Sequence, residues 1–175
     1  MMFNIFQQFI MDNSVFLSIG TNSGDKIKNL NLLLTNINKK SINILKISSV
    51  YNSEPFESNC KNNFYNIVIK VQTHYNLLDF FNITQIIEQD MGRKIKNNPN
   101  IERIIDIDIL TYENLVFSNK NLIIPHTEIH KRRFVLLPWS EISSDYIIPK
   151  YNKTVKFLLN NVKDSSKVCK LDYKL

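Results

Sequence analysis

The sequence predicts an α+β fold, a ferredoxin-like sandwich in which the elements follow one another as β-α-β-β-α-β. Two observations predict it. Apolar and β-branched residues alternate or run together in four short segments, as they do in strands. Apolar residues recur at helical spacing in two longer segments, after the first and the third of these strands. Helices that cover one face of such a sheet would leave its other face free for a functional site.

The first half of this order begins with a strand over 15–20, which ends at a glycine. A turn rich in Asn, Ser and Asp then caps a helix that runs to about Lys39, because these side chains accept hydrogen bonds from free backbone N–H groups. The second strand is expected over 42–51 and the third over 65–73, where apolar and polar residues alternate. A polar loop, 52–63, joins them.

The second half begins with a helix over 77–91, followed by Gly92 at the position of a C-terminal cap. A basic loop, 93–102, leads into the fourth strand, which ends at about Tyr112. These elements complete the expected core.

Additional elements are expected after the core. Two short extended pieces, 115–117 and 122–124, predict a hairpin. Residues 127–142 have a helical pattern that we expect to break before Pro138, and 153–162 form a last short helix.

The domain organisation is expected to be simple. Residues 14–163 form a single catalytic domain, preceded by an extension of unknown role over 1–13 and followed by a polar C-terminal tail over 164–175. The apolar residues near the N-terminus are too few to span a membrane and lack the features of a secretion signal. No membrane partner is therefore expected.

Charge and cysteine content narrow the function classes. A net charge of +6 and a pI near 9.2 favour an anionic partner such as a nucleotide. The lysines are scattered rather than gathered in one stretch, so no nucleic-acid partner is expected. Cys60 and Cys169 lie far apart and form no metal-binding pattern. They indicate free thiols in a reducing, cytoplasmic setting.

The most informative segment is the fourth strand, where two aspartates interrupt an apolar run. Asp106 and Asp108 are two residues apart, so their side chains point to the same face of the strand. Two ionised carboxylates this close repel each other unless a cation lies between them, and Mg²⁺ prefers such oxygen ligands. A solvated edge strand is the alternative for this pair alone.

Positive charge is concentrated around this pair. Acidic metal ligands together with several arginines are the composition that phosphoryl transfer needs, because guanidinium groups stabilise the charge of the transition state. No glycine-rich phosphate loop is present in the sequence, so side chains would hold the phosphates. The basic residues near the pair are Arg93, Lys94, Lys96, Arg103, His126, His130, Lys131, Arg132 and Arg133.

Seven motifs follow one another in a recognisable order. They are Gly20-Thr21-Asn22, 48–56, Phe64-Tyr65-Asn66, Glu88 to Arg93, Arg103-x-x-Asp106-x-Asp108, Pro125-His126 with Arg132-x-Phe134, and 137–142. In this order and spacing they resemble 6-hydroxymethyl-7,8-dihydropterin pyrophosphokinase of folate biosynthesis, over about Val15 to Val162.

The resemblance implies a reaction and its site. The enzyme would move pyrophosphate from ATP to the pterin hydroxyl and release AMP, with Asp106 and Asp108 holding two Mg²⁺ ions. Arg93 and Arg103 would complete the catalytic group and flank a loop that closes over ATP. The implied ATP contacts are Gln85, Glu88, Lys94, His126 and Arg132. The implied pterin contacts are Ser53, Phe56, Phe64, Asn66 and Phe134. The protein would act as a monomer or homodimer.

Other interpretations of the residues remain open. Phe64 and Phe134 could be core residues, and His126 could lie on the surface. The chain could instead be another Mg²⁺-dependent nucleotidyl or phosphoryl transferase on the same core, or an RNA-binding module. The loop before Arg103 also departs from the resemblance. Asn100 offers no aromatic surface for adenine, so we expect weaker ATP binding or slower closure.

Overall fold

The computed structural model describes residues 13–56, 61–93 and 102–175. Their main sheet has the strand order β10-β3-β4-β1-β5, with β2 also paired to β4. Its elements and the helices between them are β1 (Asn13–Thr21), α1 (Lys26–Lys39), β2 (Asn43–Ile47), β3 (Tyr51–Ser53), β4 (Phe64–Thr73), α2 (Leu77–Asp90), β5 (Asp106–Tyr112) and β10 (Val168–Lys170). The pairings of this sheet are antiparallel. The predicted β-α-β-β-α-β order is therefore confirmed.

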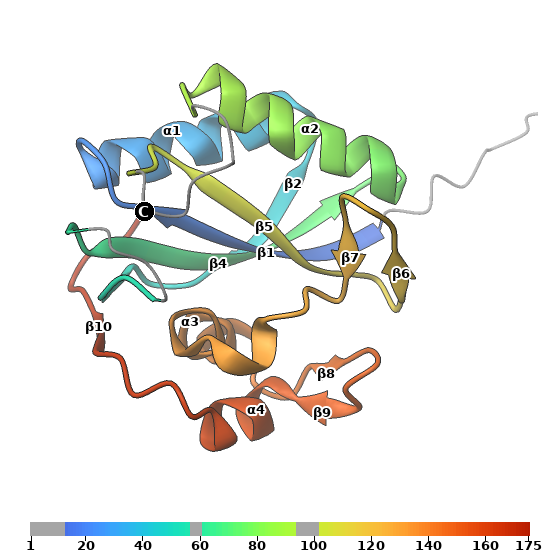
Figure 1. The fold of residues 1–175 in the computed structure, drawn as a ribbon. Coiled ribbons are helices and arrows are strands. Elements are labelled where there is room, and N and C mark those ends of the chain that lie inside the picture. Colours follow the sequence, from blue (N-terminus) through green and yellow to red (C-terminus); the bar gives the residue numbers. More distant parts are fainter. Residues whose placement is uncertain (1–12, 57–60, 94–101) are drawn as a thin grey trace, which may run out of the picture.

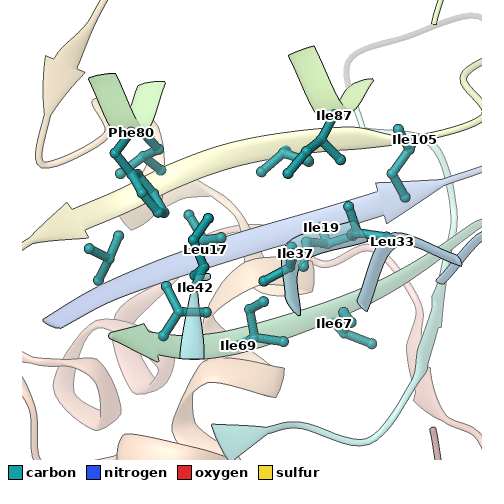
Figure 2. Close-up of a cluster of buried hydrophobic side chains, with 14 of the residues drawn as sticks. Leu17, Ile19, Leu33, Ile37, Ile42, Ile67, Ile69, Phe80, Ile87 and Ile105 are labelled. Carbon is teal, nitrogen blue, oxygen red and sulfur yellow. The ribbon is translucent and has the colours of Figure 1, made fainter. Parts of the chain in front are cut away.

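The helices α1 and α2 lie on one face of the sheet and bury the main core (Figure 1). Figure 2 shows Leu17 and Ile19 of β1 and Ile69 of β4 beneath Phe80 and Ile87 of α2. Side chains alternate across a strand, so the residues between these apolar positions point to the opposite face. Where β1, β4 and β5 bring Gly20, Asn66 and Asp106 side by side, residues of this opposite face form the functional site described below.

The opposite face is not free, which corrects one expectation. Phe16, Val68 and Leu110 are buried there against Trp139 of α3 (Arg133–Ser143) and against α4 (Val155–Asn161). Figure 1 shows both helices below the sheet. Apolar residues on this side of three central strands require a cover. Among the described residues, a cavity is present at the end of this face, beside Gly20, Asn66 and Asp106.

The predicted second strand is divided in two. Between β2 and β3, Ser48 exchanges hydrogen bonds with Val68 of β4: its backbone N–H donates to the Val68 carbonyl at 3.0 Å, and its Oγ accepts from the Val68 N–H at 3.0 Å. This side-chain bond takes the place of a regular backbone pairing, so the strand is interrupted. Such competition from serine is common.

The segment after the core also differs from the prediction. The expected hairpin is present, formed by β6 (Phe117–Ser118) and β7 (Ile123–Ile124). The helical pattern 127–142 is a short 3₁₀ turn, Ile129–Lys131, followed by α3, which continues through Pro138. Proline removes one hydrogen bond from the helix. Burial of Pro138 and its neighbours against the sheet offsets that loss.

Two further short pairings were not predicted from the sequence. A second hairpin forms from β8 (Ile147–Ile148) and β9 (Lys153–Thr154), and Thr154 caps α4 by accepting from the Phe157 N–H at 3.1 Å. The C-terminal segment is not merely a polar tail, because β10 pairs with β3 at the edge of the sheet. Among the described residues, no helix has the length and apolar content of a membrane span.

Candidate active site

The site lies where three strands bring polar residues together on one face of the sheet. Gly20 of β1 is paired with Asn66 of β4 on one side and with Asp106 of β5 on the other. Asp108 is paired with Ser18 in the next row. These positions line a cavity of about 250 Å³, whose walls are Ser18, Gly20, Ser53, Glu54, Phe56, Phe64, Asn66, Arg103, Asp106, Asp108, Arg132 and Phe134.

The two aspartates are neutralised by arginines. Asp106 contacts Arg93 through Oδ1, with 2.6 Å to the guanidinium Nη1, and its Oδ2 contacts Arg103. The Oδ2 of Asp108 lies 3.2 Å from Nη1 of Arg132. Both aspartates face the cavity, as predicted from their spacing, while the buried Ile107 between them points into the main core. The repulsion expected of two carboxylates is offset here by cations.

A metal ion is compatible with this donor set. The described residues contain no cluster of three or more His, Cys, Asp or Glu side chains of the kind that holds a metal without help. Mg²⁺ does not need such a cluster, because it is commonly bound by one or two carboxylates together with substrate phosphates and water. Asp106 and Asp108 supply two carboxylates at the wall of an open cavity.

Glu88 has a different position from the one expected. Its side chain is only 2% exposed, and its Oε1 accepts from the Ile107 N–H at 2.7 Å and contacts Arg93. A carboxylate buried in this way supports the aspartate strand and orients Arg93. The Glu88 side chain lines neither cavity, and a nucleotide contact at this residue stays a prediction.

Arg103 is held at its backbone by Asn22. The Asn22 N–H donates to the Arg103 carbonyl at 3.0 Å, and the Arg103 N–H donates to Oδ1 of Asn22 at 2.6 Å. Asn22 is buried and belongs to the turn that follows β1. This pair of hydrogen bonds fixes the point at which the chain enters β5, so the Arg103 side chain starts from a defined position.

His126 is presented with a defined tautomer. Its Nδ1 accepts from the Glu128 N–H at 3.2 Å, which leaves the proton of the neutral ring on Nε2. The Nε2 atom lies 3.9 Å from Oδ2 of Asp108. Burial lowers the pKa of His126, although the nearby Asp108 opposes this shift. The ring is therefore a neutral donor at pH 7.

A second cavity adjoins the first at Asp108. It encloses about 260 Å³ beside His126, between β5, the β6–β7 hairpin and α2. Its lining residues are Phe81, Ile107, Asp108, Ile109, Lys120, Asn121, Leu122, Ile123, His126 and Thr127. Lys120 and Asn121 were not identified from the sequence, because they belong to no motif used there.

At the other end of the first cavity, Asn66 is oriented by Ser53. The Nδ2 of Asn66 donates to Oγ of Ser53 at 2.9 Å, and both residues are buried. The amide oxygen of Asn66 faces Gly20, since a Cβ added at Gly20 would lie 3.2 Å from it. The site therefore presents a fixed acceptor, next to a glycine that leaves room for a ligand.

Three phenylalanines form the apolar walls of this end. Phe56, Phe64 and Phe134 all line the cavity and are half-buried, and Phe134 also packs against the core that contains Trp139. The Phe56 and Phe134 rings are 6.0 Å apart at an angle of 53°. The Arg132 guanidinium lies 5.9 Å from the Phe134 ring. The structure thus brings the five expected pterin contacts together at one end of the cavity.

Of the remaining predicted residues, one lies away from both cavities and one falls outside the described residues. Gln85 is half-buried on α2 and lines neither cavity. Lys94 lies outside the described residues, as do Lys96 and Asn100 of the divergent loop. Conversely, Ser18 and Glu54 line the first cavity without having been identified. Ser18 could have been found by period-two spacing, because it lies two residues before Gly20 on the same face.

Comparisons with known proteins agree with this geometry. The family model described as 7,8-dihydro-6-hydroxymethylpterin-pyrophosphokinase (HPPK) matches residues 16–144. The 2-amino-4-hydroxy-6-hydroxymethyldihydropteridine pyrophosphokinase of Haemophilus influenzae is 32% identical over 137 residues, which cover 78% of this chain and 85% of that protein. The Aquifex aeolicus protein of the same name is 34% identical, with 82% and 88% covered.

Longer proteins are also similar. The folic acid synthesis protein fol1 of Schizosaccharomyces pombe is 36% identical over 135 residues, which cover 77% of this chain but only 18% of that protein. The chain thus spans about a fifth of the length of such relatives. A solved structure of wild-type Plasmodium falciparum HPPK-DHPS superposes with a TM-score of 0.70 at 17% identity, covering 86% of this chain and 44% of that one. This last likeness supports the fold alone.

Proposed function

The chain belongs to the 7,8-dihydro-6-hydroxymethylpterin-pyrophosphokinase family, and we propose that it transfers pyrophosphate from ATP to 6-hydroxymethyl-7,8-dihydropterin and releases AMP. One observation carries the proposal. A single cavity joins a slot with aromatic walls, beside which Glu54 is exposed to solvent, to a pair of carboxylates surrounded by arginines. A flat heterocycle and a polyphosphate need these two environments side by side. The family match does not favour the alternative transferase or the RNA-binding module.

The neutral end would bind the pterin. Phe64 and Phe134 provide aromatic faces for the ring, and offset stacking adds about 0.5–1.5 kcal/mol beyond burial. The oxygen of Asn66 would accept from the N–H groups at the edge of the pterin, since Ser53 already holds the amide by its other end. Phe56 would close the slot.

The charged end would bind the triphosphate of ATP with two Mg²⁺ ions held by Asp106 and Asp108. Held there, the ions would neutralise phosphate charge and favour displacement at phosphorus. Arg93, Arg103 and Arg132, which pair with the aspartates here, would turn to phosphate oxygens as bidentate donors. His126 would donate from Nε2 to a phosphate. The cavity beside it has room for the nucleoside.

The reaction would then be an in-line displacement. The hydroxymethyl oxygen of the pterin attacks the β-phosphorus and its hydroxyl proton passes to water. The bond from that phosphorus to the oxygen bridging to the α-phosphate breaks, and AMP leaves with that oxygen. The two ends of the cavity hold the reactants, so positioning supplies a large part of the rate enhancement. Arginines aimed at the transferred group stabilise its charge in the transition state.

The test is AMP formation from ATP and Mg²⁺, with and without the pterin, for the wild type and for Asp108→Asn. We expect pterin-dependent AMP in the wild type and a loss of kcat of about 10³-fold in the variant, because the amide cannot supply the charge that the metal needs. The loss should persist at saturating pterin. Chelation of Mg²⁺ should abolish the wild-type activity as well.

Asp145→Asn is the matched control, since it removes the same charge from an exposed residue beyond α3. It should retain wild-type rates. Folded wild-type protein that forms no AMP with the pterin would overturn the proposed reaction. Full activity in Asp108→Asn would be consistent with the proposed reaction but would contradict the role of Asp108 as a metal ligand.

A further inference from the structure

One carboxylate outside the cavity accepts hydrogen bonds from two other segments of the chain. Glu141, in the last part of α3, accepts from the Ser49 N–H at 3.1 Å, the Ser49 hydroxyl at 2.8 Å and the Tyr51 hydroxyl at 2.9 Å. It also pairs with Lys170 of β10 at 2.9 Å. Both carboxylate oxygens are used, and they connect α3 to the start of β3 and to the C-terminal strand.

The Glu141 side chain is 29% exposed and accepts four hydrogen bonds from Ser49, Tyr51 and Lys170. Burial by itself would raise the pKa of Glu141, but hydrogen bonds from Lys170, Ser49 and Tyr51 outweigh it and lower the pKa. Burial and Glu141 together raise the pKa of Tyr51, which therefore stays a donor over the physiological range. The Tyr51 side chain is 5% exposed.

Two of the segments joined at Glu141, α3 and β3, also carry residues of the neutral slot. Phe134 precedes Glu141 by seven residues, or two helical turns, so the two lie on the same side of α3. Tyr51 is paired with Asn66 in the sheet, and two residues further along β3 Ser53 holds the Asn66 amide. The cluster thus fixes the helix that bears one aromatic wall relative to the strand that orients the acceptor.

We propose that Glu141 is a positioning residue for the pterin: it sets the separation between Phe134 on α3 and the Ser53–Asn66 pair on the sheet. The inference rests on the proposed function. The flat pterin ring would bind tightly only if Phe134 lies at stacking distance from it and the amide oxygen of Asn66 points at its edge. Glu141 contacts neither the ring nor the phosphates, so its effect acts through the slot alone.

The variant Glu141→Gln tests this inference. The amide of Gln has nearly the size of the carboxylate. Its NH₂ group cannot accept a hydrogen bond, so the bonds donated by Ser49 or by Lys170 to that position are lost. We expect KM for the pterin to rise about tenfold, since a small misplacement of a binding group is costly. KM for ATP and kcat at saturating pterin should stay within about twofold of the wild type.

Two further measurements separate positioning from loss of fold. Fluorescence titration with oxidised 6-hydroxymethylpterin, in the absence of ATP, should give the same tenfold weakening in Glu141→Gln. Tyr51→Phe removes a single donor and should weaken pterin binding by a smaller factor, so the inference remains testable if Glu141→Gln is unstable. Asp145→Asn again serves as the charge control and should bind the pterin as the wild type does.

The outcomes distinguish this inference from the proposed function. An inactive wild type that does not bind the pterin would overturn the proposed function itself. An active wild type whose folded Glu141→Gln and Tyr51→Phe variants keep the wild-type KM for the pterin would overturn only the role of Glu141. Equal increases in KM for pterin and for ATP would also overturn it, because they would indicate a general structural defect.

Discussion

The two ends of the cavity differ in how they are prepared for a ligand. At the neutral end, Asn66 is already fixed by Ser53 and the aromatic walls leave a slot open between them. At the charged end, the functional groups bind one another: Asp106 pairs with Arg93 and Arg103. An uncharged site can therefore be complete before its ligand arrives, whereas a highly charged one needs internal partners that its ligand must replace.

This comparison predicts that substitutions at the two ends change different kinetic parameters. The largest effect is expected from Arg103→Ala at the charged end. Its guanidinium would stabilise the transferred group, so kcat should fall by about 10²–10³ while KM for the pterin changes little. Steady-state rates with each substrate varied in turn would measure both. A change confined to the pterin KM would contradict the division between the two ends.

A smaller effect, on the other parameter, is expected from Gly20→Ala at the neutral end. The added Cβ would lie 3.2 Å from Oδ1 of Asn66 and 3.6 Å from the Phe64 ring. It would enter the pterin slot, so KM for the pterin should rise about tenfold with kcat nearly unchanged. The backbone at Gly20 is not left-handed, so space alone decides the result. Unaltered pterin affinity would place the ring elsewhere in the cavity.

The smallest effect is on the pH dependence of the protein's stability, through His126 at the charged end. Because burial lowers the pKa of His126, the unfolded chain binds this proton more readily than the folded one. Protonation of His126 has no effect on the free energy of unfolding well above about pH 6.5, the ordinary pKa of histidine. As the pH falls below that value, it lowers the free energy of unfolding progressively. In urea unfolding across this range, the free energy of unfolding should fall less steeply with decreasing pH in His126→Gln than in the wild type.

His74→Gln, which changes an exposed histidine, is the control and should retain the wild-type slope. A steeper loss of stability in His126→Gln would reverse the sign argued here. The attraction of Asp108 for a protonated His126 would then outweigh the effect of burial.

The fold could largely be predicted from the sequence because its signals are local. Alternation in β4 and helical spacing in α1 and α2 each lie within one segment, and the order of segments then defines the topology. The same alternation placed Asp106 and Asp108 on one face. The division between β2 and β3 could not be predicted, since it depends on the hydroxyl of Ser48 reaching across to β4.

Glu88 marks the limit of motif-based prediction at the site. Its place in a motif suggested a nucleotide contact, yet it lies on the buried side of α2 with Phe80, Thr84 and Ile87. The helical spacing of these residues carries that information, and it would have indicated a structural carboxylate. Glu141 offers no such local signal, because its partners come from two distant segments, 49–51 and β10, that only the folded chain brings together.

Gly20 has a consequence for substrate length. It is paired with Asn66 on one side and Asp106 on the other, so a single backbone row joins the pterin acceptor to the first carboxylate. Two strand spacings make that row about 10 Å long. Hydrogen-bonded strands keep a constant spacing, so the distance from the pterin acceptor to the first carboxylate is fixed. A pterin whose hydroxyl is carried on a longer arm would overshoot the phosphate, whichever side chains surround it.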